Sequence, residues 1–212
     1  MEKSSIILVG GGGHCKSVIE VAESMGIRIG GILDIPENVG KKVLGYPIIG
    51  TDEMIPEWVD QAEFVVTVGH IRDASVRICL HEKIEAAGGH LATLIASTAH
   101  VSKYAKIGEG SVIMHQAMVN AGAKIGKGCI INTFANIEHD AVIGNYCHIS
   151  TGAMVNGDCR IGAGTFLGSQ SVMVNGVSVV EGCVIAAGSM VRKNIVRKGV
   201  YSDNPAILKI RL

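Results

Sequence analysis

The sequence is poor in aromatic residues and in proline, and it has no excess of charge of either sign. Among 212 residues there are one Trp, four Tyr, three Phe and four Pro, and 19 Lys and Arg balance 19 Asp and Glu. A chain with zero formal net charge has no broad electrostatic attraction for nucleic acid or for an anionic membrane. We therefore expect neither of these as a partner.

Long apolar runs are also missing. No segment approaches the roughly 20 consecutive apolar residues that span a bilayer. The opening MEKSSIILVGGGG contains an acid and reaches glycine after a few apolar residues, which is unlike a secretory signal peptide. We expect a cytoplasmic protein without a membrane span.

The six cysteines form no CxxC pair, which argues against a zinc knuckle or a thioredoxin-like motif. In the cytoplasm they should remain reduced. Cysteine-based metal binding and disulfide scaffolding are therefore not expected.

Glycine, in contrast, is abundant at 28 residues, and the second half of the chain is strictly periodic. Every sixth residue from Val101 to Val191 is aliphatic, without an insertion. The residue four places after each aliphatic one is mostly small, and four of the cysteines occupy this position: Cys129, Cys147, Cys159 and Cys183.

A period of six fits neither the 3.6-residue turn of a helix nor the two-residue alternation of a strand. It predicts a triangular prism, in which each hexapeptide forms a short strand and a corner and three hexapeptides complete a coil. Coils then stack at about 4.8 Å, the usual strand spacing, so that residues 18 apart lie above one another. The aliphatic residue points inward, and the cysteines at the small position act as compact hydrophobic residues.

The first hundred residues follow a different pattern. Strands are expected in SSIILVGGGG, RIGGILD and AEFVVTVGH, helices in HCKSVIEVAESMG and ASVRICLHEKIEAAG, and a last short strand in HLATLI. Strands that alternate with helices imply a parallel sheet. We therefore divide the chain into an α/β domain, residues 1–96, and a repeat domain, residues 97–212.

A glycine run, Gly10 to Gly13, lies between the first strand and the first helix. Such a turn lets backbone N–H groups approach a phosphate at the helix N-terminus, and Asp34 ends the next strand, where a ribose-binding acid is found in such folds. Cys15 and Lys16 replace the third glycine of a dinucleotide fingerprint, so a mononucleotide or nucleotide sugar is favoured over NAD. A turn that serves only the fold is the alternative.

His139 is distinguished by its register in the repeat. It lies two places after the inward Ile137, and its neighbours one coil away, Ala121 and Gly157, are both small. The imidazole would therefore stand in open space, and Asp140 could orient it, as a general base requires. The two side chains converge only if a corner of the prism lies there, because adjacent residues of a strand point to opposite faces.

These motifs resemble those of the hexapeptide-repeat acetyltransferases with an N-terminal nucleotide-binding half-Rossmann domain. That family includes UDP-4-amino-sugar N-acetyltransferases of bacterial glycan biosynthesis and sialic acid O-acetyltransferases. The likeness covers nearly the whole chain, through GGGGHCKSVIE, ILD, VTVGHIR, IEHDAVIG and GDCRIGAGTFLGSQS. It implies an α/β half-Rossmann domain, a left-handed parallel β-helix, and a homotrimer with active sites between neighbouring prisms.

The resemblance also implies the chemistry. His139 would be the general base and Asp140 the carboxylate that raises its basicity. Acetyl-CoA would be the co-substrate, in contact with His148 and, mainly through the backbone, with Ser169 and Ala187.

On the acceptor side, the resemblance implies that the nucleotide sugar is held by four residues of the α/β domain, Gly12, Gly13, His14 and Asp34. His70 departs from the family pattern, because an asparagine often stands at this position. The identity of the acceptor therefore stays open.

The expected reaction is direct transfer of an acetyl group from acetyl-CoA to a UDP-4-amino sugar, with O-acetylation of sialic acid as the alternative. Two other classes also fit the sequence. One is a zinc lyase or hydratase with His115, His139 and His148 as ligands across a trimer interface, and the other is a non-catalytic scaffold.

A basic cluster near the end of the repeat has two interpretations. Its charges could bind the phosphates of CoA, or they could only face water. Its members are Arg192, Lys193, Arg197 and Lys198.

Overall fold

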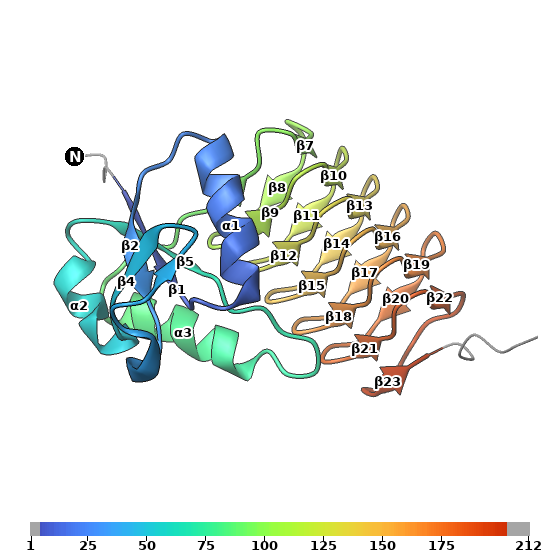
Figure 1. Ribbon diagram of the computed structural model, residues 1–212. Coiled ribbons are helices and arrows are strands. Elements are labelled where there is room, and N and C mark those ends of the chain that lie inside the picture. Colours follow the sequence, from blue (N-terminus) through green and yellow to red (C-terminus); the bar gives the residue numbers. More distant parts are fainter. Residues whose placement is uncertain (1–4, 203–212) are drawn as a thin grey trace, which may run out of the picture.

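A computed structural model describes residues 5–202, which form an α/β domain joined to a long prism of short strands (Figure 1). The two ends of the chain, residues 1–4 and 203–212, lie outside the described residues, and the division at 96/97 stays a prediction. Within residues 5–202 no helix is both long enough and apolar enough to cross a membrane.

The N-terminal sheet contains five strands in the order β3-β4-β2-β1-β5. Its strands are β1 (Ile6–Val9), β2 (Ile29–Leu33), β3 (Lys42–Val43), β4 (Tyr46–Gly50) and β5 (Glu63–Val66). Its helical segments are α1 (Gly13–Ser24), η1 (Pro36–Asn38), η2 (Asp52–Met54), α2 (Ile55–Trp58) and α3 (Ser75–Ala86). The strands and helices expected around β1, α1, β2, β5 and α3 are confirmed.

The sheet departs from the expected all-parallel arrangement at one edge. β3 pairs antiparallel with β4, while β4, β2, β1 and β5 are parallel. The reason is local, because Leu44 and Gly45 both have positive φ, 48° and 91°, and form a two-residue turn that returns the chain at once. A parallel pair would need a much longer crossover.

The prism has three sides, each a parallel sheet. The domain side, which faces the N-terminal domain, contains β6 (Leu94–Ile95), β9 (Val112–Ile113), β12 (Ile130–Ile131), β15 (His148–Ile149), β18 (Phe166–Leu167), β21 (Val184–Ile185) and β23 (Val200–Tyr201). The methionine side contains β7 (His100–Val101), β10 (Met118–Val119), β13 (Asn136–Ile137), β16 (Met154–Val155), β19 (Val172–Met173) and β22 (Met190–Val191). The lysine side contains β8 (Lys106–Ile107), β11 (Lys124–Ile125), β14 (Val142–Ile143), β17 (Arg160–Ile161) and β20 (Ser178–Val179).

Residues 18 apart are paired on all three sides, as the six-residue period predicts. His148, for example, pairs with Ile130 below it and Phe166 above it. The sixth-position aliphatic residues from Ile113 to Val191 belong to one core cluster with the four cysteines of the small position, and the partly buried Val101 and Ile107 pack against it. These four thiols are free and buried, so their predicted role as packing residues is confirmed.

Close stacking explains the glycine that follows many of the aliphatic residues. A Cβ placed on Gly144 would lie 2.6 Å from the backbone nitrogen of Ala163 in the next coil. Real Cβ atoms do not approach backbone this closely, so any larger residue must push two coils apart. Glycine is required at this corner by the spacing of the coils.

The N-terminal domain packs on the domain side of the prism, with α1 between its sheet and the solenoid (Figure 1). One apolar core contains residues of α1 together with Leu94, Val112 and Met114 of the prism. β6 was expected as a last strand of the first domain, but it pairs with β9 and so forms the first strand of the domain side. The short strand therefore starts the first coil and links the two parts.

Helix α3 adds polar contacts to this junction. The Arg77 side chain is fully buried, and its Nε donates to the backbone oxygen of Gly128 in the prism, 2.8 Å away. Its Nη1 donates to the backbone oxygens of Val66 and Val68 at the end of β5, at 2.6 and 3.0 Å. One guanidinium thus joins the end of a sheet strand to a corner of the solenoid.

We expect Gly144→Ala to destabilise the protein by about 1–3 kcal/mol, because the added methyl group overpacks two stacked coils. Thermal or urea unfolding measures the loss. The matched control is Gly12→Ala, because a Cβ there meets no atom within 4 Å. Equal stability of the two variants would contradict the close-stacking explanation.

Candidate active site

His139 and Asp140 lie on the corner between the methionine side and the lysine side, which we call the His139 corner. Asp140 has φ +60°, so the chain turns there and the two adjacent side chains point the same way. The His139 Nδ1 lies 3.0 Å from the Asp140 Oδ2. Because a carboxylate oxygen only accepts, Nδ1 carries the hydrogen and Nε2 is left with a free lone pair.

Glycine makes room for this pair above and below. A Cβ on Gly157 would lie 2.6 Å from the His139 Nε2, and a Cβ on Gly122 would collide with the Asp140 carboxylate. Both side chains are mainly exposed, at 61% for His139 and 67% for Asp140. At such exposure the contact adds little stability, so its effect is to orient the ring.

A second carboxylate, Glu138, lies next to His139 in the sequence and is held by two asparagines of the prism. It accepts hydrogen bonds from the amide groups of Asn136 and Asn120, at 3.0 and 2.9 Å. These bonds, the one from Asn136 first, lower the pKa of Glu138 below its ordinary value. The residue before His139 therefore stays ionised and fixed.

The position of the His139 corner has a geometric consequence. It is opposite the domain side, because each coil passes from the domain side to the methionine side, then around His139 to the lysine side. Within one chain, His139 and the N-terminal domain are thus on different sides of the prism.

The glycine run forms an open helix N-terminus. Gly12 is the N-cap of α1 and Gly13 is its first residue, both are exposed, and a Cβ on either would meet nothing within 4 Å. Asp34 follows β2 beside this run, because a Cβ on Gly11 would lie 2.7 Å from the Asp34 Oδ2. The structure therefore brings Gly12, Gly13 and Asp34 together at the carboxyl edge of the sheet.

Three histidines meet where this edge faces the prism. The His148 ring centroid lies 5.6 Å from that of His70 and 6.4 Å from that of His14. The His148 Nδ1 donates to the backbone oxygen of His70 at 2.8 Å, so its Nε2 accepts from the Asn132 amide at 3.1 Å. Sequence reasoning assigned His14 to the sugar and His148 to CoA, and the structure places the two side by side.

These histidines are kept uncharged. Burial, first of all, lowers the pKa of His14 to about 3 and those of His70 and His148 to about 4. The positive charge of Arg77 lowers all three further. The cluster therefore consists of neutral rings at physiological pH.

The other predicted CoA contacts lie at the corner between the domain side and the methionine side. Ser169 and Ala187 are 18 residues apart and occupy equivalent places on successive coils. The Ser169 hydroxyl lies 3.0 Å from that of Ser150, and Ala187 is exposed. This corner is next to the side that carries His148.

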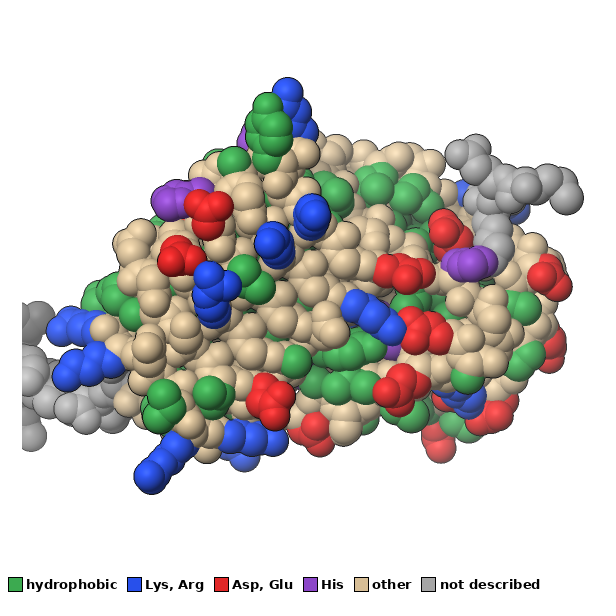
Figure 2. Space-filling view, turned by 180° about the vertical axis from the view of Figure 1, so that it is seen from behind, with side chains coloured by type: hydrophobic (Ala, Val, Ile, Leu, Met, Phe, Trp, Pro, Cys, Tyr) green, Lys and Arg blue, Asp and Glu red, His purple; other side chains and the backbone are tan. Residues whose placement is uncertain are grey.

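The basic cluster does not form a single patch. Arg192 and Lys193 line a cavity of about 200 Å³ at the end of the prism, whereas Lys198 lines another of about 280 Å³ beside Tyr146. Figure 2 shows that most of the Lys and Arg side chains of this face lie over the prism half, and most Asp and Glu over the N-terminal half. Although the net charge is zero, positive and negative side chains are thus concentrated on different halves of this face.

For the zinc alternative, the described part of one chain contains no group of three or more His, Cys, Asp or Glu side chains placed to hold a metal ion. His115 is at a third position, with its Nδ1 2.8 Å from the Thr98 hydroxyl. Its neighbours in space are therefore different from those of His139 and His148.

Sequence reasoning missed Arg77. The signal was present, because Arg77, His81 and Ile84 follow the i, i+4, i+7 spacing of one helix face, and all three are buried. Polar residues at core-facing positions of a helix indicate a buried polar junction.

The comparisons with known proteins agree with this geometry. A family model described as the PglD N-terminal domain matches residues 5–84, and one described as bacterial transferase hexapeptide (six repeats) matches residues 104–139 and 122–157. No curated protein matches the chain. The fold is thus that of a hexapeptide-repeat transferase joined to a PglD-type domain.

Two solved structures are similar over nearly their whole length. The acetyltransferase domain of PglB from Neisseria gonorrhoeae is 33% identical, covering 96% of this chain and 98% of that one with a TM-score of 0.86. PerB from Caulobacter crescentus, in complex with CoA and GDP-perosamine, is 30% identical, covering 97% of each chain with a TM-score of 0.88.

The chain therefore belongs to the hexapeptide-repeat acyltransferases that carry a PglD N-terminal domain. Its fold is the α/β half-Rossmann domain followed by the left-handed parallel β-helix that the sequence motifs suggested. The reaction class, acyl transfer, follows from this membership.

The buried histidines predict a pH dependence of stability. In the unfolded chain they bind protons near pH 6.5, but His14, His70 and His148, and likewise His81 with a pKa lowered by burial to about 3, stay neutral in the fold. The unfolded state therefore binds more protons, and the free energy of unfolding falls as the pH falls from about 6.5 through about 4. Urea unfolding at fixed protein concentration and at several pH values measures how the free energy of unfolding changes with pH, and hence how many protons the chain takes up on unfolding. His81→Gln should lower that number by up to one. A stability that is flat over this range would contradict it.

Proposed function

We propose that the protein transfers an acetyl group from acetyl-CoA to the amino group of a nucleotide-linked amino sugar, in bacterial glycan biosynthesis. The observation that carries the proposal is the His139–Asp140 pair, whose free Nε2 stands over Gly157 on an open corner. Two relatives support the substrates, since PglB was solved with acetyl-CoA and PerB with CoA and GDP-perosamine.

The donor contacts follow from the prism. His148, Ser169 and Ala187 would hold acetyl-CoA, which supplies a thioester carbonyl as the electrophile. Both ring nitrogens of His148 are already bonded within the chain, so we assign its contact to the carbon edge of the ring. Ser169 and Ala187 fit a donor that lies along the corner, because they occupy equivalent places on successive coils, where Ser169 is half-buried and Ala187 exposed.

The acceptor contacts follow from the α/β domain. The bare N-terminus of α1 at Gly12 and Gly13 suits the phosphates of a nucleotide sugar, since its N–H groups point outward and its dipole favours an anion. Asp34 suits the ribose hydroxyls at the end of β2. His14 is the second residue of the same helix and would stand between the phosphates and the prism.

In the proposed reaction His139 Nε2 takes a proton from the sugar amine as its nitrogen attacks the thioester carbonyl. Asp140 holds the Nδ1–H and stabilises the positive ring that results. The new C–N bond forms, the C–S bond breaks, and the proton leaves with the CoA sulfur. Backbone N–H groups would stabilise the charge that develops on the carbonyl oxygen.

The same geometry supports the homotrimer. His139 is opposite the side that carries its own N-terminal domain, so we infer that an acceptor held by that domain meets the His139 of another subunit. A neighbouring prism can bring its own His139 corner to the Ser169 corner and the domain side of the first. We infer that each active site uses two subunits.

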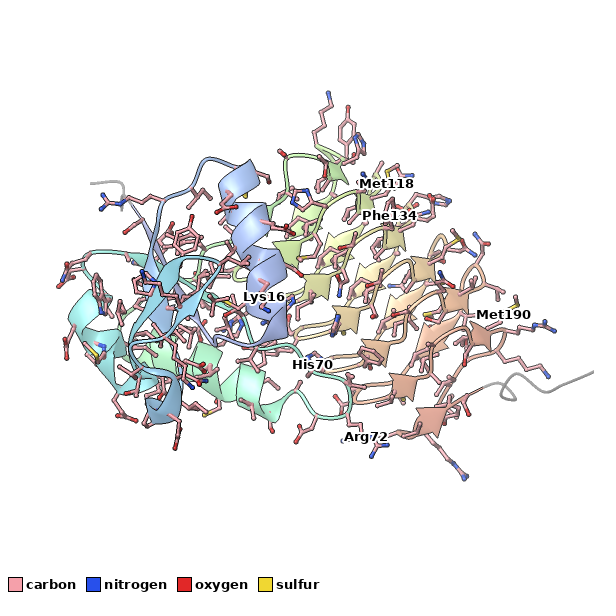
Figure 3. All side chains as sticks on the ribbon, viewed as in Figure 1. Lys16, His70, Arg72, Met118, Phe134 and Met190 are labelled. Carbon is pink, nitrogen blue, oxygen red and sulfur yellow. The ribbon has the colours of Figure 1, made fainter. Side chains whose placement is uncertain are left out.

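The methionine side is the surface that a neighbour would cover. Met118, Met154 and Met190 are stacked along it and are about two-fifths exposed, at 39%, 38% and 43%. Phe134, at the adjacent corner, is 60% exposed, and Figure 3 shows it near Met118 on the upper edge of the prism. The lysine side carries Lys106, Lys124 and Arg160 instead, and the domain side packs against the N-terminal domain in its first coils.

We expect His139→Ala to lower kcat by roughly 10²–10⁴-fold without unfolding the protein, because the base is lost from an exposed position. A thiol-release assay with acetyl-CoA and a panel of nucleotide-linked amino sugars measures the effect. Turnover close to that of the wild type would disprove the assignment.

Gly157→Ala is the companion variant, since its methyl group would displace the His139 ring. It should lower kcat in the wild type but have no further effect when combined with His139→Ala. Equal losses in both backgrounds would mean that it acts on the coil and not on the ring.

Met154→Glu should dissociate the trimer, because it places a charge in the middle of the apolar side. Sedimentation velocity should show a smaller species, and transfer should be lost because each site needs two subunits. Lys124→Glu, on the lysine side, is the control and should keep both. An active monomer would rule out the shared site.

O-acetylation of sialic acid is the second candidate. It would use the same base and donor, with a sugar hydroxyl in place of the amine. Comparing UDP-4-amino-sugar, CMP-sialic acid and free sialic acid as acceptors distinguishes the two.

A further inference from the structure

The loop between β5 and α3, residues 67–74, is fixed to the prism at two points. Arg77 bonds the backbone oxygen of Val68 together with that of Gly128, and His148 donates to the backbone oxygen of His70. A loop of this kind would usually be the mobile part of an α/β domain. Here its backbone is held firmly beside the histidine cluster.

This fixed loop lines a cavity of about 590 Å³, whose walls are Gly69, His70, Ile71, Arg72 and His148. The cavity lies between the two parts of the chain, and Figure 3 shows His70 and Arg72 on the loop that reaches from the α/β domain toward the prism before α3 begins. None of the residues assigned above to the nucleotide sugar lines it. His148 alone is shared with the proposed donor site.

His70 is only 8% exposed, yet neither of its ring nitrogens has a hydrogen-bond partner in the described part of the chain. A buried polar group without a partner costs free energy, and such groups in native proteins usually await a ligand or water. A neutral imidazole offers one donor and one acceptor, which matches a hydroxyl group.

Arg72 supplies the charge at the mouth of this cavity. It is exposed and forms no ion pair within residues 5–202, where the neighbouring Asp73 is bonded to Ser75 instead. Behind the cavity, the buried Arg77 also lacks a carboxylate partner in the described residues, since its three hydrogen bonds go to backbone oxygens. Two uncompensated guanidinium groups favour an anionic ligand.

Strand order gives the direction in which the ligand lies. Asp34 ends β2, Gly12 and Gly13 follow β1, and His70 and Arg72 follow β5, and these strands are neighbours in the order β2-β1-β5. A nucleotide sugar with its ribose at Asp34 and its phosphates at α1 therefore extends toward β5. Its sugar end reaches the 590 Å³ cavity next to the prism.

We propose that His70 and Arg72 form the sugar end of the acceptor site, with His70 hydrogen-bonded to a sugar hydroxyl and Arg72 paired with an anionic oxygen of the same molecule. This inference rests on the proposed function. In a UDP-sugar the anionic oxygen is on the phosphate next to the sugar, the end of the diphosphate that leaves α1, and in a sialic acid it is on the carboxylate. The two residues determine acceptor specificity and leave the donor site unchanged.

Steady-state kinetics of the full-length protein tests the proposal, with each substrate varied while the other is saturating. Arg72→Gln should raise the acceptor KM by about 10- to 100-fold, since a hydrogen bond to a charged group is lost. His70→Gln should raise it by about 2- to 10-fold. The KM for acetyl-CoA should stay unchanged in both, and Arg72→Lys should recover part of the loss.

Arg28→Gln is the matched control, because Arg28 is an exposed arginine at the amino end of β2, at the opposite edge of the sheet. It should behave as the wild type. A rise in the acetyl-CoA KM with Arg72→Gln would overturn the proposal, because it would mean that the loop binds acetyl-CoA instead of the acceptor. An unchanged acceptor KM in an active enzyme would overturn it as well.

Calorimetric titration of the wild type and Arg72→Gln with UDP and with free sialic acid separates this inference from the proposed function. Weaker binding of UDP by the variant identifies the diphosphate as the anion, and weaker binding of sialic acid identifies the carboxylate. Either result supports the subsite even if no acceptor in the panel is acetylated. Equal binding of both ligands by the two proteins, or binding of neither, overturns it.

Discussion

The regular hydrogen bonding between coils is the constraint on which the rest of this molecule depends. Each strand bonds to the strands one coil below and above, so that the backbone repeats every 18 residues from β6 to β22, and the last coil is two residues shorter, with Val184 paired with Val200. This register fixes which residues of the neighbouring coils lie above and below each side chain. His139 is therefore placed by its position in the repeat, and Gly157 and Gly122 can clear the space around it and Asp140 from neighbouring coils.

The same regularity gives each side of the prism its own surface. Because the outward residues of one side are stacked in a column, a few substitutions make a whole side apolar, charged or suited to a second domain. The domain side packs under α1, the methionine side is apolar, and the lysine side faces water. A solenoid with three different sides can hold its own α/β domain on one of them and still leave an apolar side open.

The junction between the two parts depends on a buried cation. Burial lowers the pKa of Arg77 to about 10, so the guanidinium remains protonated at neutral pH, and its bonds to backbone oxygens satisfy much of its hydrogen-bonding capacity. Such a charge is costly to bury unless it is well bonded. Together with burial, which is the larger cause, its charge keeps His14, His70 and His148 neutral, and the unpartnered ring of His70 can then accept a hydrogen bond at physiological pH.

By itself the sequence determined the prism, its register, its packed thiols and the glycine turn, because these follow from local spacing and from the period of six. It also selected His139, since a lone imidazole between small residues 18 apart is visible in the repeat. The antiparallel strand β3, the place of β6 in the prism and the role of Arg77 were decided by contacts between distant residues. Only the tertiary structure could show that Asp140 turns toward His139, that His14, His70 and His148 meet, and that His139 is opposite its own α/β domain, because each of these depends on how a corner turns or on how two independently patterned segments pack.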